Sequence, residues 1–233
     1  ELERTLRARK VAFESAAAPI TAFLIAPIAE FIIIPFMDAS AGMGFGTAVT
    51  PVLLIMGFDP LQIVPMVMIQ QGAAGFVGAF LHREFQNVEW RLRPMSETVR
   101  LWFIISLAGC AAVAVSITAV YKIFKVADVW IELYATLLLL GMGVVTLLQA
   151  RHERAYRPLR MIGFAALAGV NKGIGGGGYG PVVTLGGIIS GVPVKSMMAV
   201  TALTEGTVSA VAIGVWLLVS AAGVPIDSRC DRY

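Results

Sequence analysis

The chain has 233 residues, of which 58% are hydrophobic and only 14% are charged. Its mean hydropathy is +0.80. A water-soluble domain of this size has too much surface to cover with so few charged side chains, so the composition predicts an integral membrane protein. The net charge of +3 does not indicate nucleic-acid binding, because the basic residues lie in short segments between apolar runs, where membrane topology explains them.

The composition also argues against catalysis and metal binding. The two cysteines, Cys110 and Cys230, lie in an apolar run and in the C-terminal tail, and no Cys/His spacing is typical of a metal site. We therefore expect no disulfide, no metal and no cofactor. The sequence has no Ser/His/Asp, Cys/His or paired-carboxylate pattern, so an enzyme is not expected. Gly173, Gly175 and Gly178 match G-x-G-x-x-G, but the absence of a preceding strand argues against a dinucleotide site.

Residues 1–14 form a basic segment, which we expect to be cytoplasmic. Residues 15–58 then make an apolar run of 44 residues whose only charged side chains are Glu30 and Asp38. A continuous helix of that length would be about 65 Å long, about twice the ~30 Å hydrocarbon core. The run must therefore be bent, unwound or re-entrant. The glycines and prolines of "PFMDASAGMGFGTAVTP" predict the break there.

Three membrane helices are predicted next, at residues 61–81, 101–120 and 133–150, none of which contains a charged residue. Arg and Lys mark the cytoplasmic side of a membrane protein. They cluster in residues 1–14, 83–100 and 151–160. All three clusters are cytoplasmic if residues 15–58 make one net crossing, residues 61–81 return, and the following two helices form an external hairpin.

The second half begins with an apolar run of 34 residues, 161–194, which is interrupted by "NKGIGGGGYGP". This motif places a lysine and six glycines at the centre of a predicted membrane segment, and the run again exceeds the length of one span. Residues 196–226 follow, with Glu205 as their only charged side chain.

The two broken runs correspond when Pro51 is aligned with Pro181. Each break is followed by a helix that has polar residues a little past its tenth position. These are Gln70 and Gln71 in the first copy and Thr204 and Glu205 in the second. We therefore predict two transmembrane repeats, residues 15–150 and 151–233, which look parallel because both leave the cytoplasm in the same direction. The second is expected to be incomplete, since it has two spans where the first has four.

A helix broken inside a membrane leaves backbone N–H and C=O groups without partners, which is tolerated only beside protein or a polar cavity. Glycines let successive N–H groups point at an anion, and the half-helix after the break adds a partial positive charge. Lys172 adds a full charge. We therefore predict an anion site, with Glu205 and Asp38 as proton-coupling residues. The predicted substrate-binding residues are Gly42, Gly44, Gly46, Thr47, Thr50, Pro51, Gln70, Gln71, Asn171, Lys172, Gly175, Gly176, Gly177, Gly178, Tyr179 and Pro181, with Thr184 as a further hydroxyl donor.

Other interpretations of these residues stay open. The glycines are also typical of close helix packing. Lys172 is equally placed to form a structural ion pair with an acidic residue, the candidates being Glu205, Asp38 and Glu30. The two glutamines, Gln70 and Gln71, are typical of hydrogen bonds between membrane helices.

The segments "DASAGMGFGTAVTPVLLIMGFDPLQIVP" and "NKGIGGGGYGPVVTLGGIISGVPVKS", with "HREFQNV" between them, resemble the paired glycine-proline signatures of the sulfite exporter TauE/SafE family of membrane permeases. The resemblance runs from about residue 31 to residue 216. It implies two four-helix repeats, export of sulfite or another small sulfur-containing or organic anion, and proton coupling. The sequence departs from the family pattern at "MVMIQQG" and "TALTEGT", and the family's last two helices do not follow.

The sequence thus predicts an all-α polytopic membrane protein, a secondary transporter that exports a small anion such as sulfite or an organosulfonate. The alternatives are a passive anion channel and a non-transporting membrane scaffold or partner subunit. The expected partners are the anionic substrate, the lipid bilayer and further copies of the chain, with no nucleic acid. The expected location is the inner, cytoplasmic membrane, with several spans and a cytoplasmic N-terminus.

Overall fold

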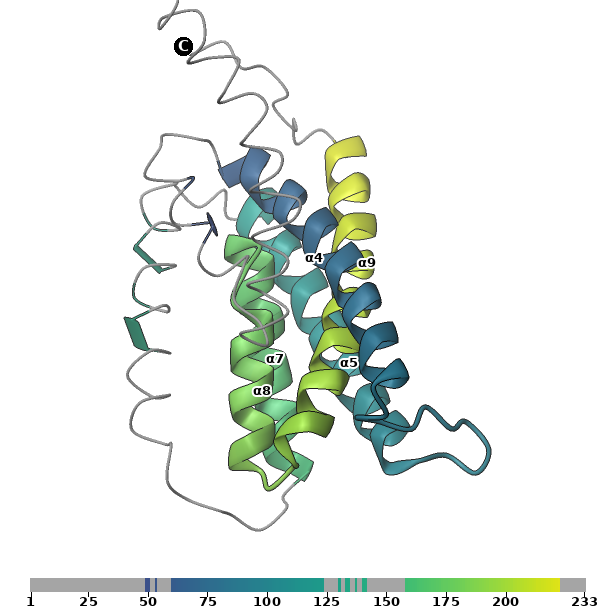
Figure 1. Ribbon diagram of the computed structural model, residues 1–233. Helices are drawn as coiled ribbons and strands as arrows, with labels where there is room; N and C mark the ends of the chain where they lie inside the picture. Colours follow the sequence, from purple (N-terminus) through teal and green to yellow (C-terminus); the bar gives the residue numbers. More distant parts are fainter. Residues whose placement is uncertain are drawn as a thin grey trace, which may run out of the picture. The chain divides into compact units, whose positions relative to one another are not determined.

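The computed structural model describes residues 60–123 and 158–222, together with positions 49, 50, 53, 130, 133, 134, 137, 140 and 141. Within these residues the chain forms α4 (Pro60–Glu84), α5 (Glu97–Ile117), the π-helical turn η2 (Thr118–Ile123), α7 (Pro158–Gly175), α8 (Tyr179–Ile189) and α9 (Val194–Ala221). Figure 1 shows these helices packed side by side, with the loop between α4 and α5 at the lower right. The described part of the chain is therefore a helical bundle.

Three of the helices are long and apolar enough to cross a membrane, namely residues Ile63–Glu84, Glu97–Tyr121 and Val194–Ala221. They correspond to the spans predicted at residues 61–81, 101–120 and 196–226, which are thereby confirmed as helices. The all-α membrane fold is confirmed with them. The predicted span at residues 133–150 and the broken run at residues 15–58 lie almost entirely outside the described residues.

Helix α5 begins where the sequence changes from a polar loop to an apolar run. The Val99 amide donates to the Ser96 hydroxyl at 3.3 Å, and Glu97 occupies the first turn, so the helix has both an N-cap and a favourable charge at its positive end. The Ser96 hydroxyl also donates to the Glu89 carbonyl at 2.9 Å, which fixes the end of the loop against the helix start.

Helices α5, α7 and α9 run in the same direction. Close approaches pair Gly109 with Gly169 and, further along both helices, Ser116 with Gly173. The Trp102 indole donates to Thr207 of α9 at 3.3 Å. At the far end, the ring centroids of Tyr121 and Trp216 are 4.7 Å apart. The contacts follow the same order along each helix, from its start to its end, so the three helices are parallel. Helix α4 is antiparallel to them, since it packs on α9 with reversed order, Gly72 facing Ser209 and Gly78 facing Ala202.

Helix α8 folds back along α7 and makes a re-entrant hairpin. Gly186 of α8 approaches Phe164, early in α7, and the Thr184 hydroxyl donates to Thr201 of α9 at 2.9 Å. At ~1.5 Å per residue, α7 is about 27 Å long and α8 about 16 Å. The hairpin therefore returns toward the end of the bundle where it entered. The described basic side chains of the loops and helix starts gather at this end, and they are Arg83, Arg91, Arg93, Arg100, Arg160 and Lys195.

Small residues at the crossings bring these helices close together. A Cβ on Gly169 would lie 2.5 Å from the Gly109 carbonyl oxygen, and a Cβ on Gly75 would lie 2.6 Å from the Gly206 amide nitrogen. Backbones that approach this closely leave no room for a larger side chain, which is the usual mode of helix packing in membranes. The buried residues of α5, α7, α8 and α9, including Ile105, form one continuous core around these crossings.

The described helices do not support the predicted parallel relation of the two repeats. Helices α4 and α9 each follow one of the two glycine-proline signatures, and they run antiparallel. The physical reason is the hairpin: because α8 returns to the end at which α7 begins, α9 crosses the bundle in the opposite direction to α4. The two helices thus have the relation expected of inverted repeats. The predicted incompleteness of the second repeat stays a prediction.

Candidate functional site

The predicted break of the second half lies between α7 and α8, at residues 176–178. Gly176 and Gly178 have left-handed backbones, with φ of +74° and +79°. Side chains other than glycine rarely adopt this conformation, so the break depends on glycine at both positions. Gly178 is the N-cap of α8, and the break residues are buried. The glycines therefore reverse the chain inside the bundle.

Side chains of neighbouring elements bind carbonyl groups near the end of α7. The Tyr121 hydroxyl donates to the Ile174 carbonyl at 2.5 Å, and the Ser116 hydroxyl donates to the Val170 carbonyl at 3.0 Å. The Gly176 amide donates to the Lys172 carbonyl at 2.9 Å. A helix that ends inside a membrane is tolerated when protein groups satisfy its backbone in this way. The α5–η2 segment is therefore part of the support for the break.

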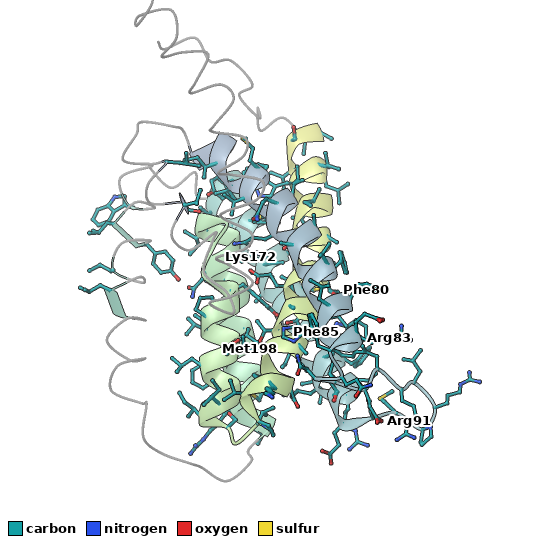
Figure 2. The ribbon with its side chains drawn as sticks, viewed as in Figure 1. Phe80, Arg83, Phe85, Arg91, Lys172 and Met198 are labelled. Atoms are coloured by element: carbon teal, nitrogen blue, oxygen red, sulfur yellow. The ribbon has the colours of Figure 1, made fainter. Side chains whose placement is uncertain are left out.

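Lys172 lies in the last turn of α7, and its side chain is fully buried. Its ammonium group donates to the side-chain oxygen of Gln71 in α4. The same nitrogen is 3.4 Å from a carboxylate oxygen of Glu205 in α9. It also lies 5.8 Å from the ring centroid of Tyr179, at the start of α8, within cation–π range. Side chains from α4, α8 and α9 thus converge on one cation, which Figure 2 shows among the helices, away from Arg83 and Arg91.

This charged cluster lies near the middle of the bundle. Glu205 is the twelfth residue of the 28 in α9, and Gln71 is the twelfth of the 25 in α4. An ionisable side chain at mid-membrane costs about 2.5–3.5 kcal/mol to insert on the more lenient scale, and such residues usually serve function. A buried ion pair is also a weak source of stability, because desolvation of both groups offsets their attraction. The cluster is therefore the candidate functional site of the described bundle, and its Lys172–Glu205 contact is also the ion pair that the structural alternative predicts.

Asn171, the neighbour of Lys172, is also buried, with 1% of its surface exposed. Its side-chain oxygen accepts a hydrogen bond from the Tyr134 hydroxyl. Its amide nitrogen has no hydrogen-bond partner among the described residues. Buried donors are normally satisfied. This donor is therefore available to a polar ligand.

The predicted hydroxyl donors have different surroundings. Thr184 donates to Thr201, so it links α8 to α9. The Thr204 hydroxyl donates to the Thr201 carbonyl within α9. Thr50 is buried, and its hydroxyl has no partner among the described residues. The amide of Gln70 likewise has none there, in contrast to that of Gln71.

The structure brings four of the predicted site residues into direct contact, namely Gln71, Lys172, Tyr179 and Glu205. Gly175 ends α7, Gly176, Gly177 and Gly178 form the break beside them, and Pro181 lies in the first turn of α8. The remaining predicted residues lie outside the described part of the chain, and they are Asp38, Gly42, Gly44, Gly46, Thr47 and Pro51.

Sequence reasoning missed the supporting side chains Ser116, Tyr121 and Tyr134. Each is a hydroxyl-bearing residue in or beside an otherwise apolar helix, and each binds a backbone or side-chain oxygen of α7. A hydroxyl in a predicted span is a weak signal by itself, because it is as often bound to its own helix. Thr207, which donates to the carbonyl of Leu203 at 2.8 Å, is an example in the same bundle.

Spanning helices, a helix broken at buried glycines and a buried cation at the break define a polytopic membrane protein of the transporter class. The family model "Sulfite exporter TauE/SafE" matches residues 28–226. The chain therefore belongs to the sulfite exporter TauE/SafE family, as its paired signatures predict. Comparison with curated proteins and with solved structures gives no significant match.

Proposed function

We propose that this protein is a secondary transporter that exports a small anion, such as sulfite or an organosulfonate, and that it binds the anion at the break between α7 and α8. The observation that carries the proposal is the fully buried ammonium group of Lys172 at the centre of the bundle. A cation in this position attracts an anion strongly, because the surroundings screen its charge far less than water does. Membership of an exporter family supports the same class of substrate.

The backbone at the break supports anion binding as well. Gly176 and Gly178 have left-handed conformations, and α8 begins directly after them. Backbone N–H groups without side chains in the way, at the start of a helix, form an anion-binding concavity. The buried amide of Asn171 adds a donor. A Cβ on Gly176 would lie 3.2 Å from the backbone of Val64, so a side chain at this position would crowd the break.

Glu205 is the proposed proton-coupling residue. Its side chain is 13% exposed, and its carboxylate lies 3.4 Å from the ammonium of Lys172, the cation that faces it among the described residues. Protonation of Glu205 would leave Lys172 with an unbalanced positive charge, which an anion compensates. Proton binding and anion binding are thereby linked. Asp38 is the second proposed proton-coupling residue and lies outside the described part of the chain.

The proposal includes an orientation. Basic loops mark the cytoplasmic side of membrane proteins, so the end of the bundle that carries Arg83, Arg91 and Lys195 faces the cytoplasm. The re-entrant hairpin then enters and leaves the bundle at the cytoplasmic side. We place the protein in the cytoplasmic membrane with a cytoplasmic N-terminus, a homo-oligomeric assembly, and no bound nucleic acid.

Flux measurements in proteoliposomes test this proposal. Labelled sulfite is loaded, and its release is followed with and without an imposed pH gradient for the wild type and for Lys172→Ala. We expect saturable flux that depends on the gradient and falls by at least about tenfold in the variant, since a charged ligand contact contributes about 1.5–3 kcal/mol. Lys195→Ala is the matched control, because Lys195 is an exposed lysine at the start of α9.

The alternatives give different results in the same assay. A passive channel would show flux that does not saturate with anion concentration and ignores the pH gradient. A scaffold would show no flux with sulfite or with a panel of sulfonates and carboxylates. Equal flux in the wild type and Lys172→Ala would overturn the assignment of the site.

A further inference from the structure

The charged cluster is already occupied by an anion of the protein itself. The Lys172 ammonium is fully buried and 3.4 Å from the Glu205 carboxylate, so the closest negative charge in the described structure belongs to α9. A substrate anion that binds the same ammonium must share it with this carboxylate or replace it. Two negative groups on one buried cation repel each other strongly, which makes replacement the favoured outcome.

We propose that Glu205 is an internal competitor of the substrate: its carboxylate holds the place of a substrate oxygen on Lys172 and must be displaced, or neutralised, before the anion binds. This inference rests on the proposed anion site at Lys172. It adds that the affinity of the wild-type protein is limited by an ion pair within the chain. The low affinity that results suits an exporter, which has to release its substrate as well as capture it.

Gln71 allows this exchange. Its side-chain oxygen accepts a hydrogen bond from the Lys172 ammonium from the opposite element, α4, and carries no net charge. The ammonium therefore keeps a neutral partner when Glu205 moves away, and the Tyr179 ring stays within cation–π range. Neutral groups of α4 and α8 thus stay beside the Lys172 ammonium when its ionic partner in α9 is exchanged.

The Glu205 side chain is the less enclosed partner of the ion pair. It is 13% exposed, in contrast to the fully buried side chain of Lys172. Displacement of the Glu205 carboxylate, rather than of the Lys172 ammonium, is therefore the movement that the proposal requires.

The test is equilibrium binding of labelled sulfite and of methanesulfonate, a permanent monoanion, to purified protein in lipid nanodiscs. We expect Glu205→Gln to bind both anions about tenfold more tightly or better, because the ligand then no longer competes with the Glu205 carboxylate for the buried ammonium of Lys172. Glu205→Asp, whose carboxylate is one methylene further away, should fall between the two. The matched control is Glu89→Gln, since the Glu89 side chain is 80% exposed in the α4–α5 loop.

A second variant distinguishes competition from a change in folding. Adding Gln71→Glu to Glu205→Gln restores a carboxylate next to Lys172 from the other helix, so anion affinity should fall back to the wild-type value or below. If Glu205→Gln proves poorly folded, Glu205→Asp with and without Gln71→Glu gives the same comparison. A purely structural Glu205 would not respond to a carboxylate supplied by α4.

The outcomes separate this inference from the function on which it rests. Unchanged or weaker binding in Glu205→Gln, with wild-type binding lost in Lys172→Ala, would overturn the competitor and keep the site. Equal binding in the wild type and Lys172→Ala would remove both. Tighter binding in Glu205→Gln, reversed by Gln71→Glu, supports the exchange on a single ammonium.

Discussion

Two glycine-rich regions of this bundle look alike in sequence but have different structural roles. At the crossing of α5 and α7, Gly109, Gly169 and Gly173 bring two unbroken helical segments into backbone contact. At the break, Gly176 and Gly178 have left-handed backbones that end one helix and begin another. The first set is needed because a Cβ would collide with a neighbour. The second is needed because of a backbone conformation that other residues rarely adopt.

The two regions also differ in whether a buried charged side chain is present. Along the α5–α7 crossing, the neighbouring polar contact is a neutral hydrogen bond from Ser116 to a carbonyl. The cation of the described bundle interior, Lys172, lies in the last turn of α7, where side chains from three other elements reach it. The packing glycines therefore bring the helices together, and the conformational glycines form the break at which we propose that the anion binds.

Substitution at Gly176 should have the largest effect. Valine at φ +74° is a strained β-branched residue, and its side chain would meet the Val64 backbone. We expect Gly176→Val to abolish sulfite binding and to lower the free energy of unfolding by about 1–3 kcal/mol. Binding to nanodisc-embedded protein and thermal unfolding with and without anion measure the two effects. Gly163→Val is the control, since Gly163 is an exposed glycine of α7 with open space around it.

A result with intact binding in Gly176→Val would remove the break from the site, whatever happens to stability. Loss of binding in a variant that still folds, so that the anion no longer raises its thermal stability, would support the site.

Substitution at Gly169 tests the role of the packing glycines at the crossing of α5 and α7. A Cβ there would lie 2.5 Å from the Gly109 carbonyl oxygen and 2.8 Å from the Ala112 side chain, so α5 and α7 would have to separate. We expect Gly169→Ala to lower the free energy of unfolding by about 1–3 kcal/mol, the usual cost of overpacking. The protein that remains folded should bind sulfite with near-normal affinity. Unfolding in mixed micelles, with Gly163→Ala as control, measures the difference.

If Gly169→Ala lost anion affinity as completely as Gly176→Val, the two kinds of glycine would not be functionally distinct. The proposed distinction between the packing glycines and the glycines of the break would then be wrong.

The sequence predicted the position of the break well, because glycine clustering and excess run length both report on a helix that cannot continue. It also named Glu205 among the three candidate ion-pair partners of Lys172, and the structure pairs the two. The parallel relation of the repeats stays a prediction, although α4 and α9, which follow the two signatures, run antiparallel. The length of an apolar run says that a helix is broken, but not in which direction the second piece runs.

Lys195 is a sequence signal for the direction in which the second piece of the broken run returns. Lys195 lies at the start of α9, directly after the hairpin, and it gathers with Arg160 at the basic end of the bundle. Positive residues on both sides of a broken run indicate that the run returns to its starting side. The partners of Lys172 were harder to predict, because Gln71 is 101 positions away along the chain and only the α4–α9 packing brings it near.

Substitution at Thr184 should have the smallest effect. It tests whether the proposed anion site extends along α8. Thr184 was a candidate hydroxyl donor for the anion, and in the structure it donates to Thr201, which links α8 to α9. We expect Thr184→Val to lower the free energy of unfolding by about 0.6 kcal/mol, the average for a hydrogen bond between membrane helices. Sulfite affinity should stay within about twofold of the wild type, because the proposed site uses the Lys172 ammonium and the break itself. Thr118→Val is the control, since the Thr118 hydroxyl binds a carbonyl of its own helical segment at 2.8 Å. A tenfold loss of affinity in Thr184→Val, without a matching loss of stability, would instead extend the anion site along α8 and make the Thr184–Thr201 contact exchangeable, as Glu205 is proposed to be.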